Sequence, residues 1–125
     1  MIDYLGLVKE FHDKYGHYKS SQPCSVWEVP IEVQSLRERL ITEEASEFVV
    51  ARDKVELADA IADLLYVTFG AAIAYGLSDV LDDIFREVHR SNMTKSMKKD
   101  EKSIPGKTVK GEGYELPNLE QFLGE

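Results

Sequence analysis

The fold is decided by the stretch LADAIADLLYVTFGAAIAYGL, residues 57–77, whose only charged side chains are Asp59 and Asp63. A helix that is apolar around its whole circumference belongs inside a protein. A carboxylate buried there is costly unless a metal ion, a cation or hydrogen bonds compensate its charge. A second acidic cluster, EEASE at residues 43–47, lies just upstream. The simplest partner that the two clusters could share is a divalent cation.

The composition indicates one soluble domain. With 125 residues, 43% of them hydrophobic, we expect a single domain covering 1–125. The net charge of −8 argues against nonspecific binding to nucleic acid. Two acids near the start of the apolar stretch, and the small residues at 70–72, argue against a membrane span. We expect no secretory signal and a cytoplasmic location, because no basic and apolar leader opens the chain and Cys24 has no internal partner.

Helical periodicity predicts four helices and no strands. The expected helices cover 2–15, 31–51, 55–75 and about 79–93. Gly16 and Gly76 are expected to end the first and third helices. Pro30 is expected to start the second helix, and a cap at Ser78 or Asp79 the fourth. Residues 16–29 are expected to form a loop, and 94–125 an extended tail rich in lysine and glycine. We therefore predict an all-α four-helix bundle, and an oligomer because the third helix is too apolar for one chain to cover.

The acids of the second helix fall on its inward side. At about 100° per residue, Glu44 and Glu47 lie within the apolar stripe and Glu43 lies on its edge. The apolar members of that stripe are Leu36, Leu40, Phe48 and Ala51. Because residues three apart point the same way, both inward glutamates can reach one ion.

The acids of the third helix form a matching stripe. Glu56, Asp59 and Asp63 follow an i, i+3, i+7 pattern, which continues through Val67, Gly70 and Ala74. Two antiparallel neighbours would face these stripes toward each other. Carboxylate oxygens suit Mg²⁺, with Mn²⁺ as the alternative. Two such ions could activate a water and stabilise a departing phosphate.

Two other uses of these acids were weighed. In the first, the acids are exposed and pair with Arg39, Arg52 or Lys54. In the second, they form a carboxylate-bridged di-iron site, which needs Glu-x-x-His on two helices. No glutamate stands three residues before any of the three histidines, so the di-iron reading fails.

Three segments resemble the all-α nucleoside triphosphate pyrophosphohydrolases, the superfamily of MazG, the all-α dUTPases and phosphoribosyl-ATP pyrophosphohydrolase. They are EEASE at 43–47, ADLLYVTFGAA at 62–72 and EVHRSNMTK at 87–95, in that order. The ending VKGEGYELPNL at 109–119 also resembles that of short MazG-like proteins. The resemblance covers about residues 5–120 and implies a homodimer or homotetramer.

The resemblance implies a metal site and a reaction. Members bind Mg²⁺ through an E-E-x-x-E segment and a later E-x-x-D, and hydrolyse the α–β phosphate bond of a nucleotide. Glu43, Glu44 and Glu47 match the first segment, and Asp63 matches the aspartate of the second. Glu44 or Glu47 is expected to help to deprotonate the attacking water.

The sequence departs from the pattern at Ala60, where relatives carry a glutamate. Two arrangements are open. Asp59 can replace the missing ligand, because it shares a face with Asp63. Alternatively, Glu56 and Asp59 bind the metal and Asp63 supports them. We favour Asp59 with Asp63, and place Glu56 third.

The resemblance also suggests residues that bind substrate. Asn92 and Lys95 match polar residues that approach the nucleotide, and Arg90 is a further candidate for a phosphate. His12 and Trp27 are candidates for the base pocket. Additional cations are offered by Lys98, Lys99, Lys102, Lys107 and Lys110.

These features predict a Mg²⁺-dependent nucleotide pyrophosphohydrolase, with dUTP as a candidate substrate. Phosphoribosyl-ATP is the alternative substrate. A non-catalytic helical module for oligomerisation or regulation is the alternative outside enzymes, and Ala60 is the main argument for it.

Overall fold

The computed structural model describes residues 1–96 and 104–124. Within these residues the chain is all-α, with four main helices and one isolated β-bridge between Ser96 and Val109. The predicted fold class is confirmed. Two compact units, Met1–Asp79 and Val80–Glu125, divide the chain, and each is described by itself. Lys98, Lys99 and Lys102 lie outside the described residues.

Helix α1 covers Tyr4–Tyr15. It begins two residues later than expected because the Asp3 carboxylate caps it, accepting a hydrogen bond of 2.9 Å from the Gly6 N–H. It ends as predicted at Gly16, whose φ of 67° is one that glycine adopts readily.

Helices α2 (Ile31–Val50) and α3 (Lys54–Ala74) pack along each other and form the centre of the first unit. Pro30 precedes α2, as predicted. The Asp53 carboxylate caps α3 by accepting a hydrogen bond of 2.8 Å from the Glu56 N–H. Because only three residues connect the two helices, they run antiparallel, and their inward stripes face each other.

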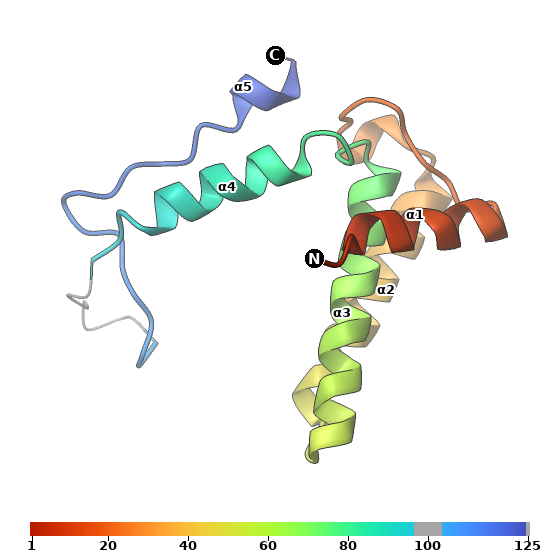
Figure 1. Cartoon of the computed structure of the whole chain (residues 1–125), viewed down its shortest axis with the longest axis horizontal. Helices are drawn as coiled ribbons and strands as arrows, with labels where there is room; N and C mark the ends of the chain where they lie inside the picture. Colours follow the sequence, from red (N-terminus) through yellow and green to blue (C-terminus); the bar gives the residue numbers. More distant parts are fainter. Residues whose placement is uncertain (97–103, 125) are drawn as a thin grey trace. The chain divides into compact units, whose positions relative to one another are not determined.

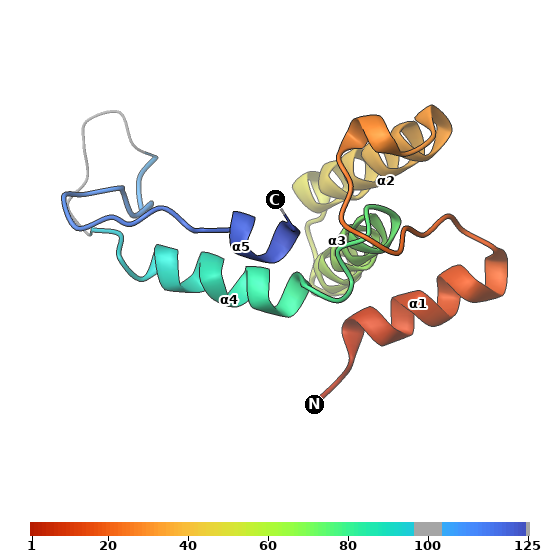
Figure 2. The same ribbon diagram turned by 90° about the horizontal axis from the view of Figure 1, so that it is seen from above.

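Helix α1 crosses α3 nearer the carboxyl end of α3 (Figures 1 and 2). Aromatic pairs hold this crossing. Tyr4 stacks on Phe69 with ring centroids 5.9 Å apart, and Phe11 meets the edge of Tyr66 at 5.5 Å. The other end of α3, which carries Asp59 and Asp63, extends beyond α1.

The loop after α1 is fastened to the end of α3. Ser20 donates from its hydroxyl to the Ala74 carbonyl at 2.7 Å, and the Cys24 N–H donates to the Tyr75 carbonyl at 3.0 Å. A short 3₁₀ helix, Val26–Glu28, follows. Gly76 has a φ of 74°, and a side chain there would clash with the Gln22 carbonyl.

The expectation that α3 is buried throughout is wrong, because its buried residues are Ala60 and, near its end, Gly70, Ala72, Ile73 and Ala74. Ile73 and Ala74 are 2% and 0% exposed, whereas Val55 and Ile61 are 79% and 45% exposed. The reason is that α1 covers only part of the helix. Among the described helices, α3 alone is long and apolar enough to cross a membrane, a property that core helices of soluble proteins share.

The predicted inward stripe of α2 is displaced. Leu36 and Phe48, expected in the core, are 39% and 43% exposed. The centre of the inward face is Arg37, which is 5% exposed, and the partly buried Glu44 follows two turns later. Leu40 and Ala51 are partly buried, in line with the prediction.

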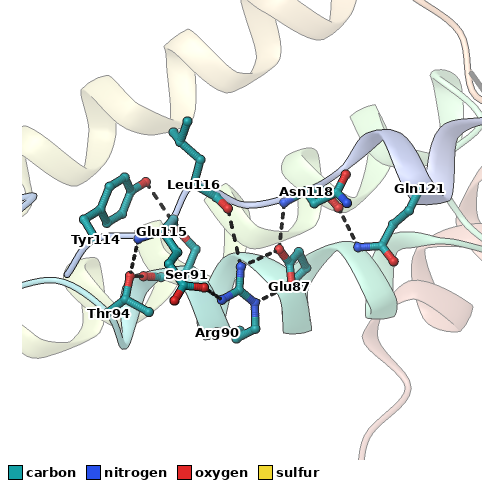
Figure 3. A network of polar contacts seen from close by, with 9 residues as sticks. All are labelled: Glu87, Arg90, Ser91, Thr94, Tyr114, Glu115, Leu116, Asn118 and Gln121. Atoms are coloured by element: carbon teal, nitrogen blue, oxygen red, sulfur yellow. Dashed lines mark hydrogen bonds and ion pairs between the residues drawn. The ribbon is translucent and has the colours of Figure 1, made fainter.

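In the second unit, α4 covers Leu81–Asn92 and begins after Val80. The predicted cap at Ser78 or Asp79 is wrong, because no side chain caps this helix. The carboxyl-terminal segment runs back along α4 (Figure 3) and ends in the short helix α5, Glu120–Leu123.

Candidate active site

Five of the predicted carboxylates converge on the seam between α2 and α3. Burial raises the pKa of Glu44, and Asp63, Glu47, Asp59 and Glu43 raise it further, in that order. The Glu44 Oε2 atom is buried and has no hydrogen-bond partner within the described residues. A buried oxygen that faces only like charges is unfavourable unless a cation joins the site.

No arginine or lysine among the described residues forms an ion pair with these five carboxylates. The alternative reading, in which they pair with Arg39, Arg52 or Lys54, is therefore wrong for the described part of the chain. Arg52 instead donates to the backbone carbonyls of Val49 and Ala51. Residues 1–96 and 104–124 thus form no ion pair that compensates the negative charge of the seam.

Glu56 stands apart from the cluster. It is exposed, it does not contribute to the raised pKa of Glu44, and its N–H is bound by the Asp53 cap. Asp63 is partly buried and Asp59 exposed, and both act on Glu44. Ala60, at the position where relatives carry glutamate, is 3% exposed and lies inside the seam. Asp59 and Asp63 are thus the acids of α3 that act on Glu44, and Glu56 is not among them.

The donor set fits a hard divalent cation, because it consists of carboxylate oxygens and includes the unpaired Oε2 of Glu44. The carboxylates are not drawn together into a finished cage. No group of three or more His, Cys, Asp or Glu side chains within residues 1–96 and 104–124 is spaced to hold a metal by itself.

Sequence reasoning missed a cationic junction where α1, α2 and α3 meet. Arg37 and His12 are 5% and 2% exposed, and both face Gly70. A Cβ added at Gly70 would lie 2.7 Å from Arg37 Nη1 and 3.1 Å from His12 Nε2. Neither Arg37 Nε nor His12 Nδ1 has a hydrogen-bond partner within the described residues. The one available signal was Gly70, which predicted a close neighbour without naming it.

His12 and Trp27 were the two predicted base-pocket residues. Trp27 lies in the loop after α1, with 84% of its surface exposed. His12, which the sequence placed either in a base pocket or on the surface, is buried at the junction. It also lines a cavity of about 490 Å³ between the end of α1, the loop and the end of α3. Lys19, another lining residue, is paired with Asp13 at 2.8 Å, so this cavity carries its own counter-ion.

The substrate-binding candidates of the second unit lie at the end of α4. Asn92 is exposed and Lys95 partly buried. Arg90 is engaged by two carboxylates, with 2.8 Å to Glu87 and 2.9 Å to Glu115 (Figure 3). The positive charge of Arg90 is thus already compensated within its own unit.

Within the described residues, helices without a sheet and acids on two antiparallel neighbours are what the resemblance to all-α nucleotide pyrophosphohydrolases implies. The model of the phosphoribosyl-ATP pyrophosphohydrolase family matches residues 8–92, more than half of the chain. The chain belongs to this family and is a hydrolase that acts on phosphoric anhydrides. No individually curated protein matches it. The matched range contains all six predicted metal ligands.

Proposed function

We propose that this protein hydrolyses the α–β phosphate bond of a nucleotide in a Mg²⁺-dependent reaction, with Mn²⁺ as the alternative ion. Water adds to the α-phosphorus, the bond to the bridging oxygen breaks, and a nucleoside monophosphate and pyrophosphate leave. One observation carries this proposal: the buried, unpaired Oε2 of Glu44 lies among carboxylates that no cation of the described chain compensates. Family membership supplies the reaction class.

The metal ligands in this proposal are Glu43, Glu44, Glu47, Asp59 and Asp63, with Glu56 outside the set. When bound, the ion lowers the pKa of a water and neutralises charge on the phosphate oxygens. The carboxylates orient that water, and Glu44 or Glu47 accepts its proton. Glu44 is the better base, because its raised pKa lies nearer to neutral pH. No covalent intermediate is needed.

Substrate contacts are proposed from the resemblance. Asn92 and Lys95 come first, because neither forms an ion pair with a carboxylate of the described residues, as Arg90 does. Arg90 would have to leave Glu87 and Glu115 to bind a phosphate, so its main role here is structural. Trp27 offers an exposed ring on which a base could stack.

Two substrates are proposed. The sequence motifs favour a deoxynucleotide such as dUTP, and the family match favours phosphoribosyl-ATP. Pyrophosphate release from a panel of the four deoxynucleotides, dUTP, ATP and phosphoribosyl-ATP, each with Mg²⁺ and with EDTA, identifies the substrate. Release from none of them would contradict the proposed activity.

We further propose that the protein is a cytoplasmic homodimer or homotetramer. The free thiol of Cys24 supports a reducing compartment. The exposed apolar side chains near the α2–α3 turn, among them Val50, Val55 and Ile61, support a partner subunit.

A further inference from the structure

Arg37 is a buried cation without a partner. It is 5% exposed, and it makes no hydrogen bond or ion pair with another described residue. Its closest electrostatic support is the phenol of Tyr75, a group that is neutral at physiological pH. A buried guanidinium normally has acceptors for its five N–H donors. Among the described residues, Nε of Arg37 is buried without any acceptor, so an acceptor from outside would complete the site.

Of the two buried polar side chains at the junction, Arg37 and His12, only Arg37 is charged at pH 7. Burial, and the neighbouring charges of Arg37 and His17, lower the pKa of His12 to about 4, so His12 is neutral at pH 7. Gly70 provides the space into which the guanidinium extends, since any side chain there would meet Arg37 Nη1. Two buried polar side chains from different helices thus meet at a position where α3 has no side chain.

The register places this junction at a defined distance from the carboxylates. Arg37 is seven residues before Glu44 on α2, and Gly70 is seven residues after Asp63 on α3. Seven residues are two helical turns, so each pair shares a face and is separated by about 10 Å. This separation matches the span from the α-phosphate of a nucleotide to the far side of its nucleoside.

A guanidinium donates hydrogen bonds and cannot accept one. It therefore binds oxygen acceptors, either carbonyl or phosphate, and rejects an amino group in the same position. In a nucleotide, the acceptor remote from the triphosphate has two sources. One is the carbonyl oxygen of a base such as uracil, and the other is the second phosphate of a phosphoribosyl nucleotide.

We infer that Arg37 is a specificity-determining residue, which donates hydrogen bonds to an oxygen-acceptor group at the end of the nucleotide remote from the triphosphate. This inference rests on the proposed function, because the carboxylates must hold the phosphates for the far end to reach Arg37. The carboxylates then define where the bond is cut, and Arg37 defines which nucleotide is accepted.

Two matched pairs of substrates test the inference. The bases of dUTP and dCTP differ along one edge, where uracil has a carbonyl at C4 and an N3–H and cytosine has an amino group at C4 and an unprotonated N3; phosphoribosyl-ATP differs from ATP by the phosphoribosyl group. Wild-type protein should prefer the acceptor-bearing member of at least one pair in kcat/KM. Arg37→Met should reduce this preference about tenfold or more. Arg37→Lys should keep part of it, and the exposed Arg39→Met, two residues away, should keep all of it.

Binding of the products separates the inference from the proposed activity. Calorimetric titration with dUMP against dCMP, and with phosphoribosyl-AMP against AMP, measures the same preference without hydrolysis. If the wild-type protein hydrolyses no nucleotide, the proposed function fails, and the binding preference still tests Arg37. Gly70→Ala, which displaces the guanidinium, should lower the same preference. This variant replaces Arg37→Met in the test if Arg37→Met does not fold.

Three results would overturn the inference. Wild-type protein could show no preference within either pair. Folded Arg37→Met could keep the wild-type preference. Arg37→Met could also lower the oligomeric mass without changing the preference, which would mean that a neighbouring subunit supplies the missing acceptor.

Discussion

His12 is neutral at pH 7 because of where the fold places it. Burial is the largest cause of its lowered pKa, followed by the charges of Arg37 and His17, and the Tyr18 carbonyl and Asp13 oppose them. The folded protein therefore takes up a proton at this position only near pH 4, whereas the unfolded chain does so near 6.5. The free energy of unfolding therefore depends on pH through this difference between the folded and unfolded pKa of His12.

We predict that His12→Gln changes the pH dependence of unfolding. In the wild-type protein the contribution of His12 is fully present above pH 6.5 and is lost as the pH falls toward 4, because the unfolded chain binds the proton first. The loss is on the order of 3 kcal/mol across this range. The free energy of unfolding, measured with urea at pH 7, 5.5 and 4.5, should decline less with falling pH for His12→Gln than for the wild type. His89→Gln, an exposed histidine on α4, should behave as the wild type. Equal declines in wild type and His12→Gln would contradict the prediction.

Glu44 is the residue on which the metal site depends. Its pKa is raised in the folded state, so its ionised form is destabilising, and the folded protein gains relative stability as the pH falls. We predict that Glu44→Gln raises the melting temperature at pH 7 by about 2 °C or more and that the gain shrinks at pH 5. Mg²⁺ should raise the melting temperature of the wild type and not that of Glu44→Gln. Glu56→Gln is the matched control. Its melting temperature at pH 7 should equal that of the wild type, and Mg²⁺ should raise it as in the wild type.

At the scale of elements, α4 is joined to the carboxyl-terminal segment by a polar network (Figure 3). Glu87 accepts two hydrogen bonds from Arg90 and a third, of 2.7 Å, from the Asn118 N–H. Arg90 and then the Asn118 N–H are the main causes that lower the pKa of Glu87 to about 2. Ser91, which is 1% exposed, donates to the Glu115 carbonyl at 2.7 Å. The segment is thus held through backbone groups as well as side chains.

We predict that Glu87→Gln loosens this segment. The neutral amide cannot hold Arg90 and the Asn118 N–H as the carboxylate does, so exchange of the Asn118 amide hydrogen should accelerate. In the wild type, protection should persist as the pH falls until the folded pKa near 2 is approached. Arg86→Gln, an exposed neighbour on α4, is the control. Unchanged exchange at Asn118 in Glu87→Gln would show that Glu87 is not the main anchor.

The sequence was sufficient for the helices and for the convergence of acids, because both follow from helical period and from one short connection. It was not sufficient for Arg37. An arginine in an inward stripe is normally assigned to the surface, and its burial here depends on how α1 crosses α3. The exposure of Glu56 was not predictable from spacing either. Spacing alone put it on the acidic stripe, whereas the structure leaves it exposed in the first turn of α3.

At the scale of the whole molecule, the first unit leaves much apolar surface uncovered. Val49, Val50, Val55 and Ile61 are 66%, 64%, 79% and 45% exposed, around the α2–α3 turn. Exposed apolar side chains of this kind support the proposed interface between subunits. A partner subunit at this end of the helices would adjoin the carboxylates on α3.

We predict that the protein is a dimer or tetramer in solution and that Ile61→Glu weakens the assembly. The charge would have to be buried at the interface, so light scattering after size exclusion should show a lower mass. Val26→Glu, in the 3₁₀ helix of the loop, is the control. A monomeric wild type would refute the proposed assembly, and an Ile61→Glu variant of unchanged mass would exclude this face as the interface.

The proposed function requires that the carboxylates of α2 and α3 form a metal site for pyrophosphohydrolysis. The most direct measurement is Mg²⁺-dependent release of pyrophosphate from dUTP and phosphoribosyl-ATP by wild type, Asp63→Asn and Glu56→Gln, with folding checked by circular dichroism. We predict that Asp63→Asn stays folded and loses activity by about 100-fold or more, and that the activity of Glu56→Gln stays within about twofold of the wild type. A folded Asp63→Asn variant as active as the wild type would contradict it.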